Sequence, residues 1–160
     1  MLKVKYFAYG SNIDIERLKN RVEFYGERVK EGEPYTLKDY NLLFNAGIDF
    51  SLTAFANIVP KKGSEVEGIL YNLTPTQFDR LDQYEALYEK QFFPLDKDTI
   101  ACTYVARQDV TTKKEKRPDL RYLNIIIDGC KATGLKKTYE KLVKFKIKNY
   151  KLKKGNKHKL

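Results

Sequence analysis

Apolar and polar positions divide the chain into short strand-like runs and longer amphipathic runs. Runs rich in β-branched and aromatic residues, bounded by turn residues, predict strands at 3–9, 40–44, 52–59, 66–73, 92–95 and 99–107. Turn residues at 45–47 and 60–63 separate the middle runs. We expect these runs to be consecutive strands of a sheet.

Four other segments carry apolar residues at the spacing of a helix. They begin near Ile13, at Thr74, near Pro118 and at Lys137 or Thr138. The second has Thr at the N-cap, Pro in the first turn and Gln three residues after the Thr, which predicts a capping box and a helix to about residue 88. Gly134 is typical of a C-terminal stop for the third helix.

Strands and helices that mix along 160 residues predict a mixed α/β (α+β) fold. The hydrophobic fraction of 42% indicates a packed globular protein, and the length suits one small domain.

Most of the net charge lies at the C-terminus. The chain carries +10, and residues 136–160 contain eleven Lys and a single acidic residue. From Lys144, lysines alternate with apolar residues, which suits a strand or an adherent extended arm. We therefore expect a domain over 1–143 and a basic, Lys-rich C-terminal arm over 144–160 that is partly disordered.

The basic arm offers an alternative to catalysis. Its lysines and interleaved apolar residues can contact nucleic acid or an anionic surface, so the chain can be a non-catalytic binding module. The segment has no arginine and no recognised nucleic-acid motif, so base-specific readout is not indicated. Lys-rich ends are also common as solvated termini.

Neither a membrane span nor a disulfide scaffold is indicated. Charges interrupt the apolar residues of the N-terminus, and no stretch approaches the roughly 18 apolar residues that a span needs. We therefore expect a cytoplasmic protein. Cys102 and Cys130 lack CxxC spacing, so we expect two buried thiols rather than a zinc site or a disulfide.

Glu85 is the most informative residue for chemistry. On a helix that runs to residue 88, Glu85 shares one face with Leu81 and Tyr88. A carboxylate on an apolar face is desolvated, which raises its pKa and makes it a better proton acceptor and donor near neutrality. The alternative is a solvated Glu85 at a frayed helix end.

The segment Tyr9-Gly10-Ser11-Asn12 joins the first strand to the first helix. Gly10 permits a backbone angle that other residues resist, and Ser11 or Asn12 can cap the helix. This segment, the Tyr9–Asn12 loop, is a candidate anion-binding loop, with helix capping alone as the alternative.

The chain has one histidine, His158, which lies in the basic arm. A His-based metal site or a Ser-His or Cys-His nucleophile is therefore not indicated, and no phosphate-binding GxxxxGK loop is present. Any chemistry is expected to rest on carboxylate, hydroxyl and backbone amide groups, with no metal.

Several segments resemble the gamma-glutamylcyclotransferase-like (AIG2-like) family. The matching segments, in the family's order, are 6–12 (YFAYGSN), 56–60 (ANIVP), 63–64 (GS), 66–71 (VEGILY), 81–85 (LDQYE), 121–123 (RYL), 134–135 (GL) and Tyr139. The resemblance extends over about residues 3–143.

The resemblance implies a barrel-like mixed sheet flanked by helices, whose pocket binds a small gamma-glutamyl compound without metal or organic cofactor. It implies that Glu85 is the catalytic general acid and base. Tyr9, Gly10, Ser11, Asn12 and Tyr139 would bind the substrate. The reaction would release 5-oxoproline and a free amino acid or amine.

This chain departs from the family pattern at two places. Ala86 stands where the family usually has Gly, and Gln91 and Phe92 stand where a tyrosine often occurs. The leaving group can therefore differ from that of other members, and a gamma-glutamyl amine or a protecting gamma-glutamyl group remains an open alternative.

Overall fold

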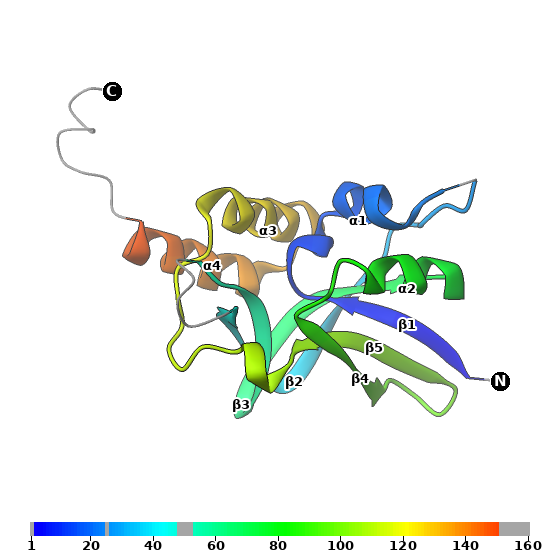
Figure 1. The fold of residues 1–160 in the computed structure, drawn as a ribbon, viewed down its shortest axis with the longest axis horizontal. Coiled ribbons are helices and arrows are strands. Elements are labelled where there is room, and N and C mark those ends of the chain that lie inside the picture. The colour runs from blue at the N-terminus through cyan, green and yellow to red at the C-terminus, as the bar shows by residue number, and fades with distance from the viewer. Residues whose placement is uncertain (1, 25, 48–52, 151–160) are drawn as a thin grey trace.

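The computed structural model describes residues 2–24, 26–47 and 53–150. Figure 1 shows a curved sheet with the helices along one side of it. The strands are β1 (Lys3–Ala8), β2 (Glu33–Ala46), β3 (Phe55–Asn72), β4 (Tyr88–Pro94) and β5 (Thr99–Ala106). Their order is β2-β3-β1-β5-β4, and β1 pairs parallel with β5 while the other pairs are antiparallel. The predicted mixed α+β fold is confirmed.

Four α-helices and two short 3₁₀ turns complete the structure. The helices are α1 (Ile15–Val22), α2 (Pro75–Asp82), α3 (Leu120–Thr133) and α4 (Lys136–Asn149), and the turns are η1 (Ser11–Ile13) and η2 (Gln108–Val110). In the described part of the chain, no helix has the length and apolar character required to cross a membrane. Cys102 and Cys130 are buried free thiols, as predicted.

The sheet curls until its two edge strands approach each other. The rings of Tyr35 on β2 and Phe93 on β4 stack with centroids 6.1 Å apart, and Phe7 on β1 makes an edge contact with each at 5.9 Å. Gly68 on β3 makes room for Phe7, because a Cβ there would lie 2.7 Å from that ring. This aromatic cluster gives the sheet the barrel-like curvature that the resemblance implied.

The middle of the sheet differs from the sequence prediction. The runs 52–59 and 66–73 were expected to be separate strands, but the described residues of both belong to the continuous strand β3. The predicted turn at 60–63 is instead an irregularity in the pairing of β3 with β2. Lys38 of β2 pairs with Glu65, but Tyr40, two residues later, pairs with Pro60. Gly63 has a φ of 85° there and donates its backbone N–H to Asp39 across 3.0 Å.

Sequence signals predicted the start of α2 and the end of α3 correctly, but not the end of α2. The capping box of α2 is present, with Thr74 and Gln77 exchanging hydrogen bonds of 3.0 and 3.1 Å. Gly134 ends α3 in the left-handed conformation, with a φ of 76°. The expected extension of α2 to residue 88 is wrong, because the helix stops at Asp82.

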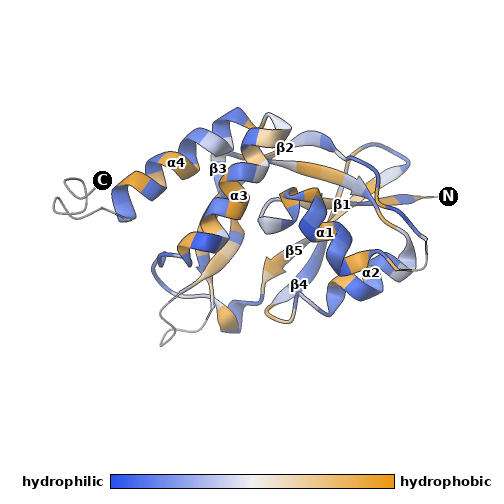
Figure 2. Cartoon of the chain, turned by 90° about the horizontal axis from the view of Figure 1, so that it is seen from above, coloured by the Kyte–Doolittle hydropathy of each residue, from blue (hydrophilic) through white to orange (hydrophobic). Residues whose placement is uncertain are grey.

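The C-terminal segment also differs from its prediction. Residues 144–149 were expected to be a strand or an extended arm, but they continue helix α4. Leu142 is buried, and Phe145, three residues later, packs on Phe44 of β2 with centroids 5.1 Å apart. Figure 2 shows apolar and polar residues alternating along this helix to its end. The division into 1–143 and 144–160 stays a prediction, and residues 151–160 lie outside the described residues.

Candidate active site

A cavity of about 280 Å³ opens where β1 ends and the chain turns into α1. Residues of the Tyr9–Asn12 loop, α1, β3, β5, α3 and the segment between α2 and β4 line it. The sequence-predicted residues Tyr9, Gly10, Ser11, Asn12 and Glu85 all line this cavity, although Glu85 is far from the others in the sequence.

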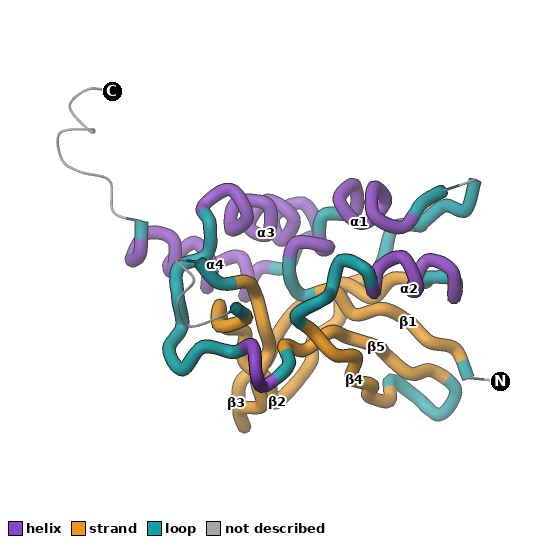
Figure 3. Tube along the Cα trace, in the orientation of Figure 1, coloured by secondary structure: helices purple, strands orange, loops and turns teal. Residues whose placement is uncertain are grey.

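Glu85 enters the cavity from a turn rather than from a helix. After α2 ends, the backbone N–H of Tyr84 donates to Leu81 across 2.9 Å and that of Glu85 donates to Asp82 across 3.1 Å. These short-range bonds tighten the chain into turns, and Figure 3 shows loop between α2 and β4. The helical-face argument for Glu85 is therefore wrong, although the side chain is partly buried in the cavity.

The cavity changes the acidity of Glu85. Burial raises the pKa of its carboxyl from 4.5 to about 7, and the positive charge of Arg21 opposes part of that rise. Asp82 adds to the rise, and Arg17 opposes it. The carboxyl therefore exchanges its proton near neutral pH, which suits an acid and base.

Two arginines of α1 hold the side chains of the Tyr9–Asn12 loop. Arg17 donates from Nε to the Ser11 hydroxyl across 2.9 Å, and Arg21 donates to the Asn12 amide oxygen at 3.4 Å. The Asn12 amide nitrogen in turn donates to the Tyr6 hydroxyl across 3.0 Å. Since Ser11 and Asn12 are 8% and 4% exposed, this network fixes their position inside the protein.

Gly10 contributes space rather than a special backbone angle. Its φ is −114°, outside the left-handed region that favours glycine. A Cβ at Gly10 would lie 3.5 Å from the Ala56 side chain and 3.6 Å from the Tyr122 hydroxyl. A larger side chain at this position would therefore extend toward that hydroxyl.

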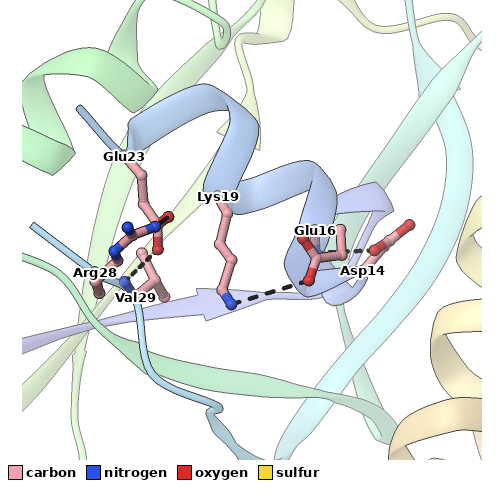
Figure 4. A network of polar contacts seen from close by, with 6 residues as sticks. All are labelled: Asp14, Glu16, Lys19, Glu23, Arg28 and Val29. Atoms are coloured by element: carbon pink, nitrogen blue, oxygen red, sulfur yellow. Dashed lines mark hydrogen bonds and ion pairs between the residues drawn. The ribbon is translucent and has the colours of Figure 1, made fainter. Parts of the chain in front are cut away.

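Helix α1, which carries Arg17 and Arg21, is anchored at both ends by polar contacts of other residues. Asp14 caps the helix by accepting from the Glu16 backbone N–H at 3.0 Å, and Glu23 accepts from the Val29 backbone N–H at 2.6 Å (Figure 4). Arg28 pairs with Glu23 at 3.5 Å. These contacts fix both ends of the helix that carries the cavity arginines.

Two tyrosines hold the cavity wall at Ala56. The Tyr88 hydroxyl donates to the Ala56 carbonyl across 2.6 Å, and the Tyr122 hydroxyl accepts from the Ala56 backbone N–H at 3.1 Å. Burial raises the pKa of both hydroxyls, that of Tyr122 to about 12, so both are neutral at physiological pH.

Tyr9 and Tyr139 do not have equivalent places. The hydroxyl of Tyr9 donates to the Tyr104 carbonyl across 2.5 Å, so this side chain supports the cavity wall. Tyr139 is not among the residues that line the cavity. It lies on α4, which contacts α3 and β3, and it packs against the hydrophobic core.

Arg17, Arg21, Tyr88 and Tyr122 also line the cavity, although no sequence pattern was taken to predict them there. The two arginines had a usable signal, because side chains four residues apart on a helix share a face, and this helix follows the loop directly. Tyr88 and Tyr122 had none, because only the folded chain brings them to Ala56. Within residues 2–24, 26–47 and 53–150, no three His, Cys, Asp or Glu side chains are grouped so as to hold a metal ion.

Comparison with known proteins identifies one family. The family model described as "Gamma-glutamyl cyclotransferase, AIG2-like" matches residues 6–124. A gamma-glutamylcyclotransferase from Bos taurus is 27% identical over 151 residues, which cover 85% of this chain and 74% of the relative.

Solved structures share the fold. A gamma-glutamyl cyclotransferase superposes with a TM-score of 0.69 at 24% identity, over 86% of this chain and 85% of the other. An uncharacterized protein from Homo sapiens superposes with a TM-score of 0.68 at 23% identity, over the same shares of the two chains.

Proposed function

We propose that this chain, which belongs to the gamma-glutamyl cyclotransferase, AIG2-like family, converts a gamma-glutamyl amino acid or amine into 5-oxoproline and a free amine. The observation that carries the proposal is a carboxyl with a pKa of about 7 in the cavity beside the Tyr9–Asn12 loop. The reaction needs one group that accepts and returns a proton near neutral pH, and Glu85 has that property.

In the proposed reaction, Glu85 accepts a proton from the substrate's neutral alpha-amine as its nitrogen attacks the gamma-carbonyl carbon. The gamma-carbon to leaving-nitrogen bond then breaks, and Glu85 returns the proton to that nitrogen. One proton thus moves from the attacking to the leaving nitrogen, and the gamma-carbonyl is retained in the 5-oxoproline ring. The enclosed cavity holds the two reacting groups of one molecule together.

The arginines support an anionic substrate. Burial, and then the charge of Arg21, lowers the pKa of Arg17, so the two cations repel each other at the cavity. Every gamma-glutamyl compound carries an alpha-carboxylate, and a carboxylate near Arg17 and Arg21 would relieve this repulsion. In this proposal the Tyr9–Asn12 loop and the two arginines bind the glutamyl end, and no metal or organic cofactor takes part.

The test is 5-oxoproline release by the purified protein from a panel of gamma-glutamyl amino acids and gamma-glutamyl amines. Glu85→Gln should abolish release while keeping the fold, because a neutral amide cannot accept the proton. Glu89→Gln is the matched control, since Glu89 is exposed on β4 four residues away. Release that persists in Glu85→Gln, or is absent for every compound with the wild-type protein, would refute the proposal.

A further inference from the structure

Two cavity tyrosines bind the same residue with opposite hydrogen-bond directions. The Tyr88 hydroxyl is the donor in its bond to the Ala56 carbonyl, so its proton is committed. The Tyr122 hydroxyl is the acceptor in its bond from the Ala56 N–H. Among the described residues this is the only hydrogen bond of the Tyr122 hydroxyl, so its own proton is available to a molecule in the cavity.

The reason for this difference lies in the sheet. Ala56 pairs with Phe44 next to a register shift between Phe44 and Ala46 of β2. At such an irregularity the regular ladder is disrupted, and a backbone N–H can turn to another acceptor. The Ala56 N–H donates to the Tyr122 hydroxyl oxygen. This hydrogen bond uses one lone pair of the oxygen and leaves the O–H group free to donate to another acceptor.

The Tyr122 hydroxyl lies in the same cavity as Glu85 and the Tyr9–Asn12 loop. Its hydroxyl lies 3.6 Å from where a Gly10 side chain would begin, so it faces the Tyr9–Asn12 loop. Burial raises the pKa of Tyr122, the hydrogen bond from Ala56 opposes part of that rise, and the charge of Glu85 adds to it. Both side chains line the cavity. The ring is fixed by an edge contact with Phe55, with centroids 5.3 Å apart.

Tyr6 is the other cavity tyrosine whose hydroxyl accepts a hydrogen bond, from Asn12. Tyr6 is only 4% exposed, however, while Tyr122 is half-buried, and both side chains line the cavity. Tyr122 is therefore the more exposed of the two side chains.

We propose that the Tyr122 hydroxyl is a catalytic hydrogen-bond donor to the gamma-carbonyl oxygen of the substrate, an inference that rests on the proposed cyclotransferase function. When the amine nitrogen attacks, the electron pair of the carbonyl π bond moves to that oxygen. The Tyr122 O–H stabilises the negative charge without transferring its proton. The pair returns to form the ring carbonyl as the leaving nitrogen departs with the proton from Glu85.

The test compares Tyr122→Phe with Tyr88→Phe. Both substitutions keep the ring and remove one hydroxyl that binds Ala56, so they disturb the cavity wall similarly. Tyr122→Phe should lower kcat by about 100-fold to 1,000-fold with little change in KM, as expected for the loss of a donor to a developing oxyanion. Tyr88→Phe should lower kcat at least about tenfold less than Tyr122→Phe does, because it removes no donor to the substrate, and should act mainly on the melting temperature.

A binding measurement separates this inference from the reaction itself. The ring carbonyl of 5-oxoproline is the former gamma-carbonyl, so Tyr122→Phe should weaken 5-oxoproline binding about threefold to tenfold by calorimetry, and Tyr88→Phe should not. Selective weakening in a protein that turns over no gamma-glutamyl compound would support the Tyr122 contact and reject the cyclotransferase proposal. Unchanged kcat or affinity in Tyr122→Phe, equal losses in both variants, or no 5-oxoproline binding and no turnover by the wild-type protein would overturn the inference.

Discussion

The guanidinium of Arg21 lies over the ring of Tyr84, 4.8 Å from its centroid. Tyr84 immediately precedes Glu85, so this cation–π contact joins helix α1 to the turn that carries the cavity carboxyl. Arg21 therefore acts on Glu85 in two ways, through its charge and through the position of the turn.

Replacement of Arg21 by Gln should move the pH profile of the reaction. Arg21 lowers the pKa of Glu85 by favouring the carboxylate, so its loss should raise that pKa further. The acidic limb of kcat/KM should then shift to higher pH, because the unprotonated base becomes scarcer at a given pH. Arg28→Gln is the control, since its side chain is 80% exposed and pairs with Glu23. A profile that stays in place or moves to lower pH would contradict this charge effect.

The raised pKa of Glu85 should also make stability depend on pH. The folded protein holds the Glu85 proton more tightly than the unfolded chain, whose Glu has its ordinary pKa near 4.5. Ionisation therefore costs folding free energy, which is absent below about pH 4.5 and complete above about pH 7. The shift corresponds to at most about 3 kcal/mol.

Glu85→Gln should consequently stabilise the protein at pH 8 while it abolishes the proposed reaction. We expect its melting temperature to exceed that of the wild-type protein by several degrees at pH 8 and to match it near pH 4.5. Glu89→Gln, at an exposed position, should show no such trend. An equal effect of Glu85→Gln at both pH values would mean that the carboxyl is not desolvated in the folded state.

Elements defined by local chemistry could be predicted from the sequence. The capping box at Thr74 and the left-handed stop at Gly134 depend on residues close together in the chain, and both are present. The alternation of Lys with apolar residues after Lys144 pointed to a strand, but the same residues form a helix. The helix brings Phe145 into contact with Phe44, a residue distant in the sequence, and such a tertiary contact can override the local preference for a strand.

The candidate site was predictable only in part for the same reason. Glu85 and the Tyr9–Asn12 loop could be predicted from local patterns and from the resemblance to a family, but helical spacing placed Glu85 on the wrong element. The hydrogen bonds of Tyr88 and Tyr122 to Ala56 join β4 and α3 to β3. No local pattern encodes such contacts, because they exist only after the sheet and helices have packed.

Removal of the α2 cap should have a modest and specific effect on stability. Thr74→Ala removes the hydroxyl that accepts from the Gln77 backbone N–H, which should cost about 1 kcal/mol. We expect a fall in melting temperature of about 2–4 °C. Thr76→Ala is the matched control, because Thr76 is exposed in the first turn and is not the cap. Since Ala favours a helix more than Thr does, Thr76→Ala should be neutral or slightly stabilising, and equal losses in the two variants would show that the loss is not specific to the cap.

A large loss of stability is expected from a side chain at Gly68. A Cβ there would lie 2.4 Å from the Ala8 carbonyl oxygen and 2.7 Å from the Phe7 ring, and the backbone oxygen cannot move without disturbing the pairing of β1 with β3. Gly68→Ala should therefore cost about 3 kcal/mol or more in urea unfolding, or prevent folding altogether. Gly63→Asn is the control, because a Cβ at Gly63 meets no atom within 4 Å and Asn tolerates its φ of 85°. A Gly68→Ala protein as stable as this control would show that the curled sheet relaxes around the added methyl group, and the contact of Phe7 with Tyr35 and Phe93 would then not require a glycine at position 68.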